Sequence, residues 1–239
     1  MQKKIIVIPT YNEKENVKKV TEVIVEQQLD FDILFVDDNS PDGTENSILE
    51  LQKEYPNVKY LKRLVKDGLG RAYIAGFRWA LDHGYDLIMQ MDCDLSHDPA
   101  ALKLFCKAIE NNDAVFGSRY FRGIRVHNWS FGRLLLSYTS NAFIRRMLKL
   151  ESTDATTAYK MFKRDVLEKI NFETIKLKRN AFLVELVFRT EKMKFKTEEI
   201  PFIFRERESG ESKMEFKVAI ESLATVFKLS IKRLLKKYS

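Results

Sequence analysis

Cysteine is scarce in this 239-residue chain, which contains Cys93, Cys106 and no other. Two cysteines cannot form a disulfide framework and do not match a zinc-binding pattern, so we expect a reducing, cytoplasmic setting. Glycine and proline number 9 and 5, which excludes fibrous and low-complexity classes of protein. With 45% hydrophobic residues, the chain can bury the core of one large domain.

Long apolar segments are lacking as well. No run approaches the roughly 18 apolar residues of a membrane-spanning helix, and no signal peptide precedes the first apolar segment at 5–8. Any membrane contact should therefore be peripheral. A Walker A sequence is missing, and Gly68 and Gly70 fail as a dinucleotide fingerprint because Tyr73 occupies the third glycine position. Gly76 should instead allow a helix to pack closely.

Acidic residues are missing from 119–149, where seven basic side chains occur. The whole chain has a net charge of +7 and a pI near 9.2, which favour an anionic partner. A membrane surface, a phosphorylated substrate and nucleic acid all fit that charge. Nucleic acid is disfavoured, because the basic segments contain no known nucleic-acid-reading motif. The seven residues are Arg119, Arg122, Arg125, Arg133, Arg145, Arg146 and Lys149.

Short apolar runs alternate with helical patterns along the first 116 residues. Each run is apolar almost throughout, which is typical of parallel strands buried on both faces. The sequence therefore predicts an α/β fold with a mainly parallel sheet flanked by helices, and ligands at the carboxyl ends of the strands. The predicted strands are 5–8, 33–36, 58–61, 87–91 and 114–116, and the predicted helices are 13–28, 44–55, 69–83 and 99–111.

The second half of the chain is less regular. We expect helices at 129–150 and 182–189, a strand at 158–162, and extended segments at 195–204 around Pro201. A long helix is predicted at 214–238, with apolar residues on one face and lysines on the other. That pattern is typical both of an interfacial amphipathic helix and of an ordinary packed helix. We accordingly divide the chain into a domain at 1–213 and a basic amphipathic helix at 214–239.

Asp92 and Asp94 follow the fourth predicted strand. In an extended backbone residues i and i+2 point the same way, so the two carboxylates can bind a hard divalent cation. Mg²⁺ or Mn²⁺ takes one or two carboxylates and leaves positions for substrate phosphates. The alternative is a pair of solvated loop aspartates, one of which caps the next helix.

Two further polar segments are candidates for ligand binding. Asp38 follows the second strand and suits a hydrogen bond to a base or ribose, although Asp42 and Thr44 beside it also have turn and capping chemistry. Arg207 and Lys213 lie around a turn, where they suit phosphate binding. The alternative for that turn is a solvated loop with incidental charge.

Six segments taken together resemble family 2 inverting glycosyltransferases, and among them the dolichol- and polyprenol-phosphate mannose synthase group. They cover nearly the whole chain in order. The segments are PTYNE at 9–13, VDDNSPDGT at 36–44, R-x-x-K-x-GLG-x-AY at 63–73, DCDLSHDP at 92–99, GSRY at 117–120 and R-x-x-GESKM at 207–214.

The resemblance implies a GT-A (Rossmann-like) fold, a nucleotide-sugar site and a bound Mg²⁺ or Mn²⁺. By position, Asp92, Asp94 and Ser96 would bind the metal, and Asp94 and Arg119 would be catalytic, with Arg119 at a phosphate. Residues carried over to the nucleotide-sugar site are Pro9, Tyr11, Glu13, Val36 through its backbone, Asp38, Asp92, Cys93, Asp94, Arg119, Arg207 and Lys213.

The implied reaction is transfer of mannose from GDP-mannose to a dolichyl or polyprenyl phosphate, with inversion, by a peripheral enzyme on the cytoplasmic face of a membrane. Two alternatives stay open: glucosyl transfer from UDP-glucose to the same lipid, and a non-catalytic membrane module that binds nucleotide-sugar. Ala158 and Lys160 depart from the Gly and Arg usual in the group, so acceptor contacts there are less certain. Membrane attachment would be peripheral or supplied by an anchoring partner.

Overall fold

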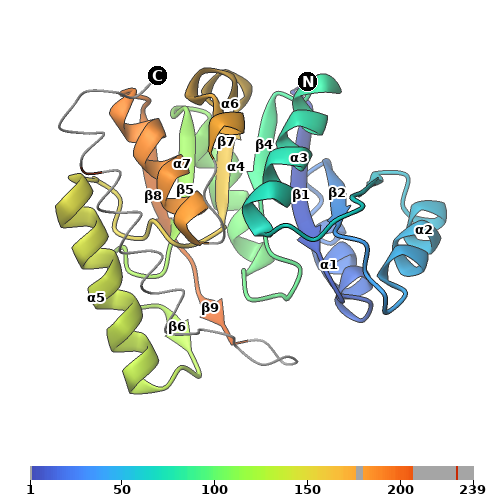
Figure 1. The fold of residues 1–239 in the computed structure, drawn as a ribbon, viewed down its shortest axis with the longest axis horizontal. Coiled ribbons are helices and arrows are strands. Elements are labelled where there is room, and N and C mark those ends of the chain that lie inside the picture. Colours follow the sequence, from blue (N-terminus) through green and yellow to red (C-terminus); the bar gives the residue numbers. More distant parts are fainter. Residues whose placement is uncertain (1, 176–179, 207–229, 231–239) are drawn as a thin grey trace.

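The computed structural model describes residues 2–175, 180–206 and 230, and is built around a seven-stranded sheet (Figure 1). The strand order is β3-β2-β1-β4-β7-β5-β8, and every pairing is parallel except those of β7 with β4 and β5. The predicted mainly parallel sheet is thus confirmed. The strands are β1 (Lys4–Thr10), β2 (Phe31–Asp37), β3 (Val58–Lys62), β4 (Leu87–Gln90), β5 (Ala114–Ser118), β7 (Lys160–Lys163) and β8 (Thr197–Pro201).

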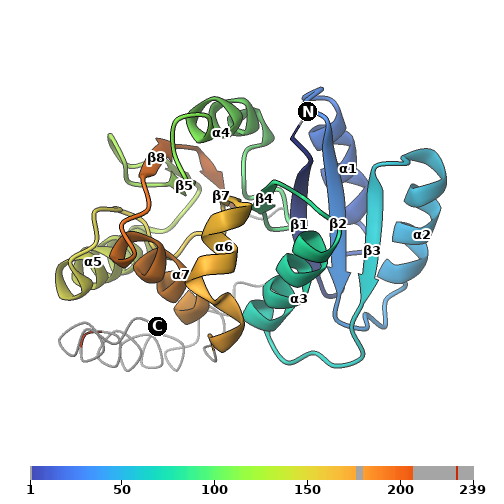
Figure 2. The same ribbon diagram turned by 90° about the horizontal axis from the view of Figure 1, so that it is seen from above.

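Helices cover both faces of this sheet (Figure 2). Alternate residues of β1 point to opposite faces, so Ile5 and Val7 join one core while Ile6 and Ile8 join the other. The first core contains residues of α3 (Leu69–Asp82), α5 (Phe131–Leu148), α6 (Arg164–Ile170) and α7 (Asn180–Lys192), and the second those of α1 (Asn16–Val25), α2 (Thr44–Glu54) and α4 (Leu102–Ile109).

Gly76 lets α3 pack closely on the sheet, as the sequence predicts. A Cβ at this position would lie 2.3 Å from Val7 Cγ1 and 3.1 Å from Val36 Cγ2, so no larger residue fits without a shift. The close approach fixes α3 against β1 and β2. Its first residues are thereby held near the carboxyl ends of those strands.

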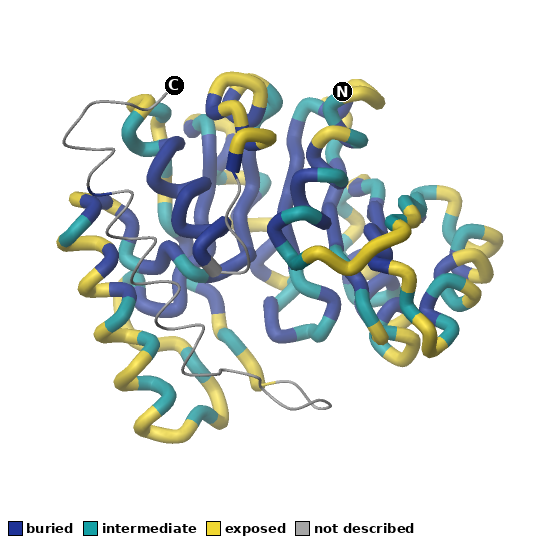
Figure 3. The backbone as a smooth tube through the Cα atoms, in the orientation of Figure 1, coloured by how far each residue is buried: buried dark blue, intermediate teal, exposed yellow. Residues whose placement is uncertain are grey.

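A short parallel pair, β6 (Val126–His127) with β9 (Phe204–Arg205), lies beside the beginning of α5 (Figure 1). The 3-10 turns η1 (Pro99–Ala101) and η2 (Phe172–Thr174) complete the elements. In Figure 3 the central strands of the sheet are buried, whereas the edge strands β3 and β8 are partly exposed and α5 is exposed along its outer side. Within the described ranges, no helix has the length and apolar character needed to cross a membrane.

All nine elements expected before residue 117 are present, with shifts of a few residues at their ends. The helix expected at 129–150 is α5, the strand expected at 158–162 begins at Lys160, and the extended segment at 195–204 contains β8. The predicted helix at 214–238 and the domain boundary after Lys213 lie outside the described residues.

Candidate active site

A cleft of about 240 Å³ opens at the carboxyl ends of β1, β2 and β4. Parallel strands that end at one edge bring their following loops together, and this is where such sheets bind ligands. The loops after the three strands meet the first residues of α3 there. The lining residues are Pro9, Thr10, Tyr11, Glu13, Asp38, Lys66, Gly68, Leu69, Ala72, Asp92, Cys93 and Asp94.

Asp37 holds the loops after β1 and β2 together from below the cleft. It is fully buried, and its Oδ1 accepts hydrogen bonds from Thr10 Oγ1 (3.0 Å) and Ser40 Oγ (2.5 Å). Asp42 accepts from the backbone N–H of Thr44 (3.0 Å) at the start of α2, so it has the turn chemistry expected of it. Of these three aspartates, only Asp38 lines the cleft.

Asp38 forms an ion pair with Arg63 and is 6% exposed. Burial raises the pKa of this carboxyl, and the guanidinium of Arg63 opposes that shift. Across the cleft, Lys66 Nζ lies 3.2 Å from the ring centroid of Tyr11. A cation–π contact of this kind orients both side chains along the wall of the cleft.

Two neighbours orient Asp92. The hydroxyl of Tyr73 lies 3.1 Å from Asp92 Oδ1, and the backbone N–H of Asp92 donates to Nδ1 of His97 (3.2 Å). His97 is buried and its ring stacks on Tyr159 at 4.7 Å. Burial lowers the pKa of His97, which favours the neutral ring that an acceptor nitrogen requires.

Asp92 and Asp94 have the donor chemistry of a Mg²⁺ or Mn²⁺ site. Both line the cleft, the side chain of Asp92 is 31% exposed, and Asp94 Oδ1 accepts from the backbone N–H of Ser96 (3.1 Å). Ser96 does not line the cleft, but its buried hydroxyl has no hydrogen-bond partner among the described residues. Carboxylate pairs suit a hard cation that also takes substrate oxygens. In the described part of the chain, no group of three or more His, Cys, Asp or Glu is placed to bind a metal.

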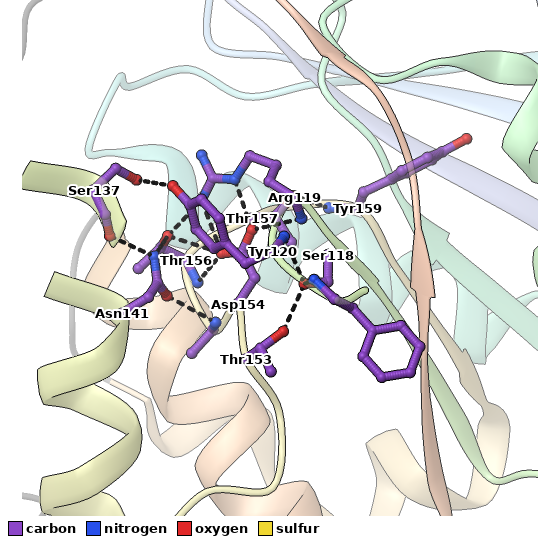
Figure 4. A network of polar contacts seen from close by, with 12 residues as sticks. Ser118, Arg119, Tyr120, Ser137, Asn141, Thr153, Asp154, Thr156, Thr157 and Tyr159 are labelled. Atoms are coloured by element: carbon purple, nitrogen blue, oxygen red, sulfur yellow. Dashed lines mark hydrogen bonds and ion pairs between the residues drawn. The ribbon is translucent and has the colours of Figure 1, made fainter. Parts of the chain in front are cut away.

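Arg119 lies beside the cleft rather than in its wall, and most of its donors are engaged (Figure 4). Its Nε and Nη2 donate to the two oxygens of Asp154 at 2.6 and 2.8 Å, and Nη2 also donates to Thr156 Oγ1 at 2.7 Å. The guanidinium is nearly buried, with 9% of the side chain exposed. The buried ion pair with Asp154 raises the pKa of Arg119 against the opposing effect of burial.

The sequence carries a family signature that agrees with this site. A sequence profile described as "Glycosyl transferase family 2" matches residues 5–171. The chain belongs to glycosyltransferase family 2. It is therefore an enzyme of the glycosyltransferase class.

Three relatives of this family 2 glycosyltransferase align over most of its length. An undecaprenyl-phosphate mannosyltransferase of Micrococcus luteus is 40% identical, over 92% of this chain and 90% of the relative. A polyprenol monophosphomannose synthase of Mycolicibacterium smegmatis is 40% identical, over 89% and 81%. A dolichol-phosphate mannosyltransferase of Pyrococcus furiosus is 34% identical over 94% of this chain, which spans 62% of that relative.

Solved structures of glucosyl-3-phosphoglycerate synthase from Mycobacterium tuberculosis have the same fold. The complex with Mn²⁺, UDP and glucosyl-3-phosphoglycerate has a TM-score of 0.69 at 14% identity, covering 96% of this chain and 80% of that chain. The complex with Mg²⁺ and UDP has a TM-score of 0.70 at 14% identity, with 96% and 79% covered. At such identity the likeness concerns the fold alone, and the GT-A class predicted from the sequence is confirmed.

The cleft of this glycosyltransferase contains seven of the predicted nucleotide-sugar residues: Pro9, Tyr11, Glu13, Asp38, Asp92, Cys93 and Asp94. Val36 does not line it; its side chain is fully buried, while its backbone pairs with Pro9 in the sheet. Arg207 and Lys213 lie outside the described residues.

Sequence reasoning missed several residues of the family 2 site. Lys66 and Tyr73 stand in the quoted 63–73 segment, which was their available signal, but no role was given to them. The sequence alone assigns no role to His97, and no pattern in the sequence links Asp154 to Arg119, 35 residues away. Such partners are determined by the tertiary fold.

Proposed function

We propose that this glycosyltransferase transfers mannose from GDP-mannose to a polyprenyl or dolichyl phosphate, with inversion at the anomeric carbon. The observation that carries the proposal is the cleft at the strand ends, which brings seven predicted donor-site residues together. The three relatives are all named as mannose-transferring enzymes of undecaprenyl, polyprenol or dolichol phosphate, which supports the sugar and the lipid class.

The donor nucleotide would bind between the loops after β1 and β2. Pro9, Tyr11 and Glu13 would contact the base and ribose from one side, and Asp38 from the other, next to the backbone of Val36. Asp38 is held by Arg63, so its carboxylate is oriented before the donor arrives. A group that is oriented in advance loses less conformational entropy on binding.

Asp92 and Asp94 would hold Mg²⁺ or Mn²⁺ through carboxylate oxygens, with Ser96 as a further oxygen donor. The cation would neutralise charge on the diphosphate as it leaves. Tyr73 and His97 fix Asp92 from two sides, and the backbone of Ser96 fixes Asp94. These contacts support the positions of the two carboxylates.

The acceptor phosphate would be the nucleophile. Its oxygen forms a bond to the anomeric carbon while the bond from that carbon to the GDP oxygen breaks, and GDP leaves with the electron pair. Because a phosphate monoester has a second pKa of about 6, the acceptor is largely a dianion at pH 7 and needs no strong general base. The main task of the site is to bring two anions together. We assign the compensating positive charge to Arg119, Arg207 and Lys213.

We further propose that the enzyme works on the cytoplasmic face of a membrane, as a peripheral protein or with an anchoring partner. α5 supports this, because Phe131 is 78% exposed and Leu135 50% exposed on a helix that also carries several arginines. The segment 214–239 would add a second basic amphipathic contact, separate from the catalytic domain at 1–213.

The test is to mix the purified chain with GDP-mannose, Mn²⁺ and a short polyprenyl phosphate in detergent. Mannosyl lipid and GDP should appear in equal amounts, both should stop on chelation, and the anomeric configuration of the product should be opposite to that of the donor. Product from UDP-glucose alone would replace mannose by glucose in the proposal. Binding of GDP-mannose without any product would favour a non-catalytic module.

A further inference from the structure

Asn141 is a buried amide on a helix that is otherwise largely exposed. It lies on the inner side of α5 and is 3% exposed. Its Nδ2 lies 3.1 Å from both Ser137 O and Thr156 Oγ1, and its Oδ1 accepts from the backbone N–H of Ala155 at 3.0 Å (Figure 4). One side chain thus joins α5 to the segment 154–157.

The hydroxyl of Thr156 is the point at which this connection reaches Arg119. It accepts from Arg119 Nη2 (2.7 Å) and from Asn141 Nδ2 (3.1 Å), and it lies 3.2 Å from Asp154 Oδ1, to which its proton points. A hydroxyl has one donor and two acceptor positions, so all three are used.

Apart from this network, the neighbours of the Arg119 guanidinium are aromatic rings. The rings of Tyr120, Trp129 and Phe204 lie 5.4, 5.5 and 5.5 Å from its Cζ. These flat neighbours permit rotation in the guanidinium plane, which only directed hydrogen bonds can prevent. Asp154 and Thr156 supply those bonds.

We propose that Thr156 and Asn141 are positioning residues, which hold the Arg119 guanidinium in its active orientation and couple that orientation to helix α5. This inference rests on the proposed function insofar as Arg119 acts on a phosphate. Thr156 accepts a hydrogen bond from Arg119 and Asn141 donates one to Thr156, so each would act through Arg119 rather than on the substrate.

The rest of the loop is held independently, which separates positioning from folding. Glu191 of α7 accepts from the backbone N–H groups of Glu151 and Ser152, at 2.7 and 3.0 Å. Glu199 of β8 accepts from those of Thr153 and Asp154, at 2.8 and 3.1 Å. Loss of the Thr156 hydroxyl would therefore leave the loop in place, while the guanidinium would keep only its hydrogen bonds to Asp154.

The experiment compares Thr156→Val, which keeps the shape of the side chain, with Thr156→Ser, which keeps the hydroxyl. Thr156→Val should lower kcat about tenfold with little change in the KM for GDP-mannose, because misorientation affects the transition state most. Thr156→Ser should restore kcat to within about twofold of the wild type. Thr21→Val removes a fully buried hydroxyl in α1, bonded to Val17 O, and should leave kcat unchanged.

A structural role and a positioning role of Thr156 predict different effects on kcat when Thr156→Val is made in the Arg119→Lys variant, which has no guanidinium. There Thr156→Val should have almost no effect on kcat, whereas an equal loss in both backgrounds would overturn the proposal. Asn141→Leu combined with Thr156→Val should be no worse than the more damaging single variant, because both act on the orientation of the same guanidinium. Additive losses would also overturn it. A wild type without mannosyl product would contradict the proposed function instead, before any variant is compared.

Discussion

Lys160 is fully buried in β7, next to the catalytic region, and its Nζ donates to Thr157 O. Burial lowers its pKa from 10.5 to about 7, against the attraction of Asp154, Asp92 and Glu199 and with a further lowering by Arg119. Lysine side chains are rarely found fully buried in a sheet. In the folded chain the charged form of Lys160 is stabilised mainly by the nearby carboxylate of Asp154, which offsets part of the cost of burial.

Replacing Lys160 by Met should make stability less dependent on pH. Between pH 7 and 10.5 the unfolded chain binds the proton that folded Lys160 has lost, so this residue makes the wild type more stable as pH rises. Lys160→Met should therefore stabilise the protein more at pH 6 than at pH 9, by a difference of about 2 kcal/mol in urea unfolding. Lys163→Met, at a partly exposed position of the same strand, should show no such difference. An equal effect of Lys160→Met at both pH values would contradict the assignment.

Asp94 is the residue whose change should damage turnover most. Asp94→Asn keeps the shape and an oxygen for the Ser96 N–H but removes the negative charge, and we expect kcat to fall about a hundredfold. Asp98→Asn is the matched control, because Asp98 accepts from the backbone N–H of Ala100 in the same loop without lining the cleft. The fold of both variants is checked by thermal melting. A folded Asp94→Asn enzyme with normal metal-dependent activity would refute the role of Asp94.

At the scale of elements, α5 has two faces with different partners. Asn141 and Ile144 lie on its buried side, whereas Phe131, Leu135 and Tyr138 are exposed at steps of three or four residues. Large apolar side chains aligned on one exposed stripe are typical of a contact surface. The arginines of the same helix, together with Lys149 directly after it, favour an anionic binding partner for this surface.

The exposed stripe of α5 should bind anionic vesicles. Phe131→Ser combined with Leu135→Ser should weaken co-flotation with phosphatidylglycerol vesicles at least about fivefold, since each side chain contributes up to about 1.5 kcal/mol of apolar burial. Leu104→Ser is the control, because Leu104 of α4 is 49% exposed, almost the same as Leu135, on the opposite face of the sheet. If Leu104→Ser weakens flotation equally, α5 is not the contact. Activity toward a short acceptor in detergent serves as the check on folding.

Secondary structure in the first half of the chain could be predicted because each strand is an apolar run between clear turn signals. The direction of β7 could not, because four residues such as Lys160–Lys163 contain nothing that specifies antiparallel partners on both sides. The cleft was predictable since its residues follow strands that must end at one edge. The orientation of Arg119 was not, because Asp154, Thr156 and Asn141 reach it only through tertiary contacts.

For the molecule as a whole, the cleft can be tested as a binding site without any chemistry. A ligand that binds only the folded chain raises the free energy of unfolding by about 2.7 kcal/mol at a hundred times its Kd. GDP should therefore raise the melting temperature, and Mn²⁺ should increase that rise, because Asp92 and Asp94 would hold the cation and it would supply positive charge for the diphosphate.

Asp94→Asn should keep part of the shift caused by GDP alone but lose the increment from Mn²⁺. Mn²⁺ without GDP is the control in both proteins, because a shift of equal size in the wild type and in Asp94→Asn would report metal sites elsewhere on the chain. UDP measured in parallel tests the base, since contacts from Tyr11, Glu13 and Asp38 should make GDP the more effective ligand. A larger shift from UDP would move the donor from GDP-mannose to a uridine nucleotide while leaving the cleft and its carboxylate pair in place.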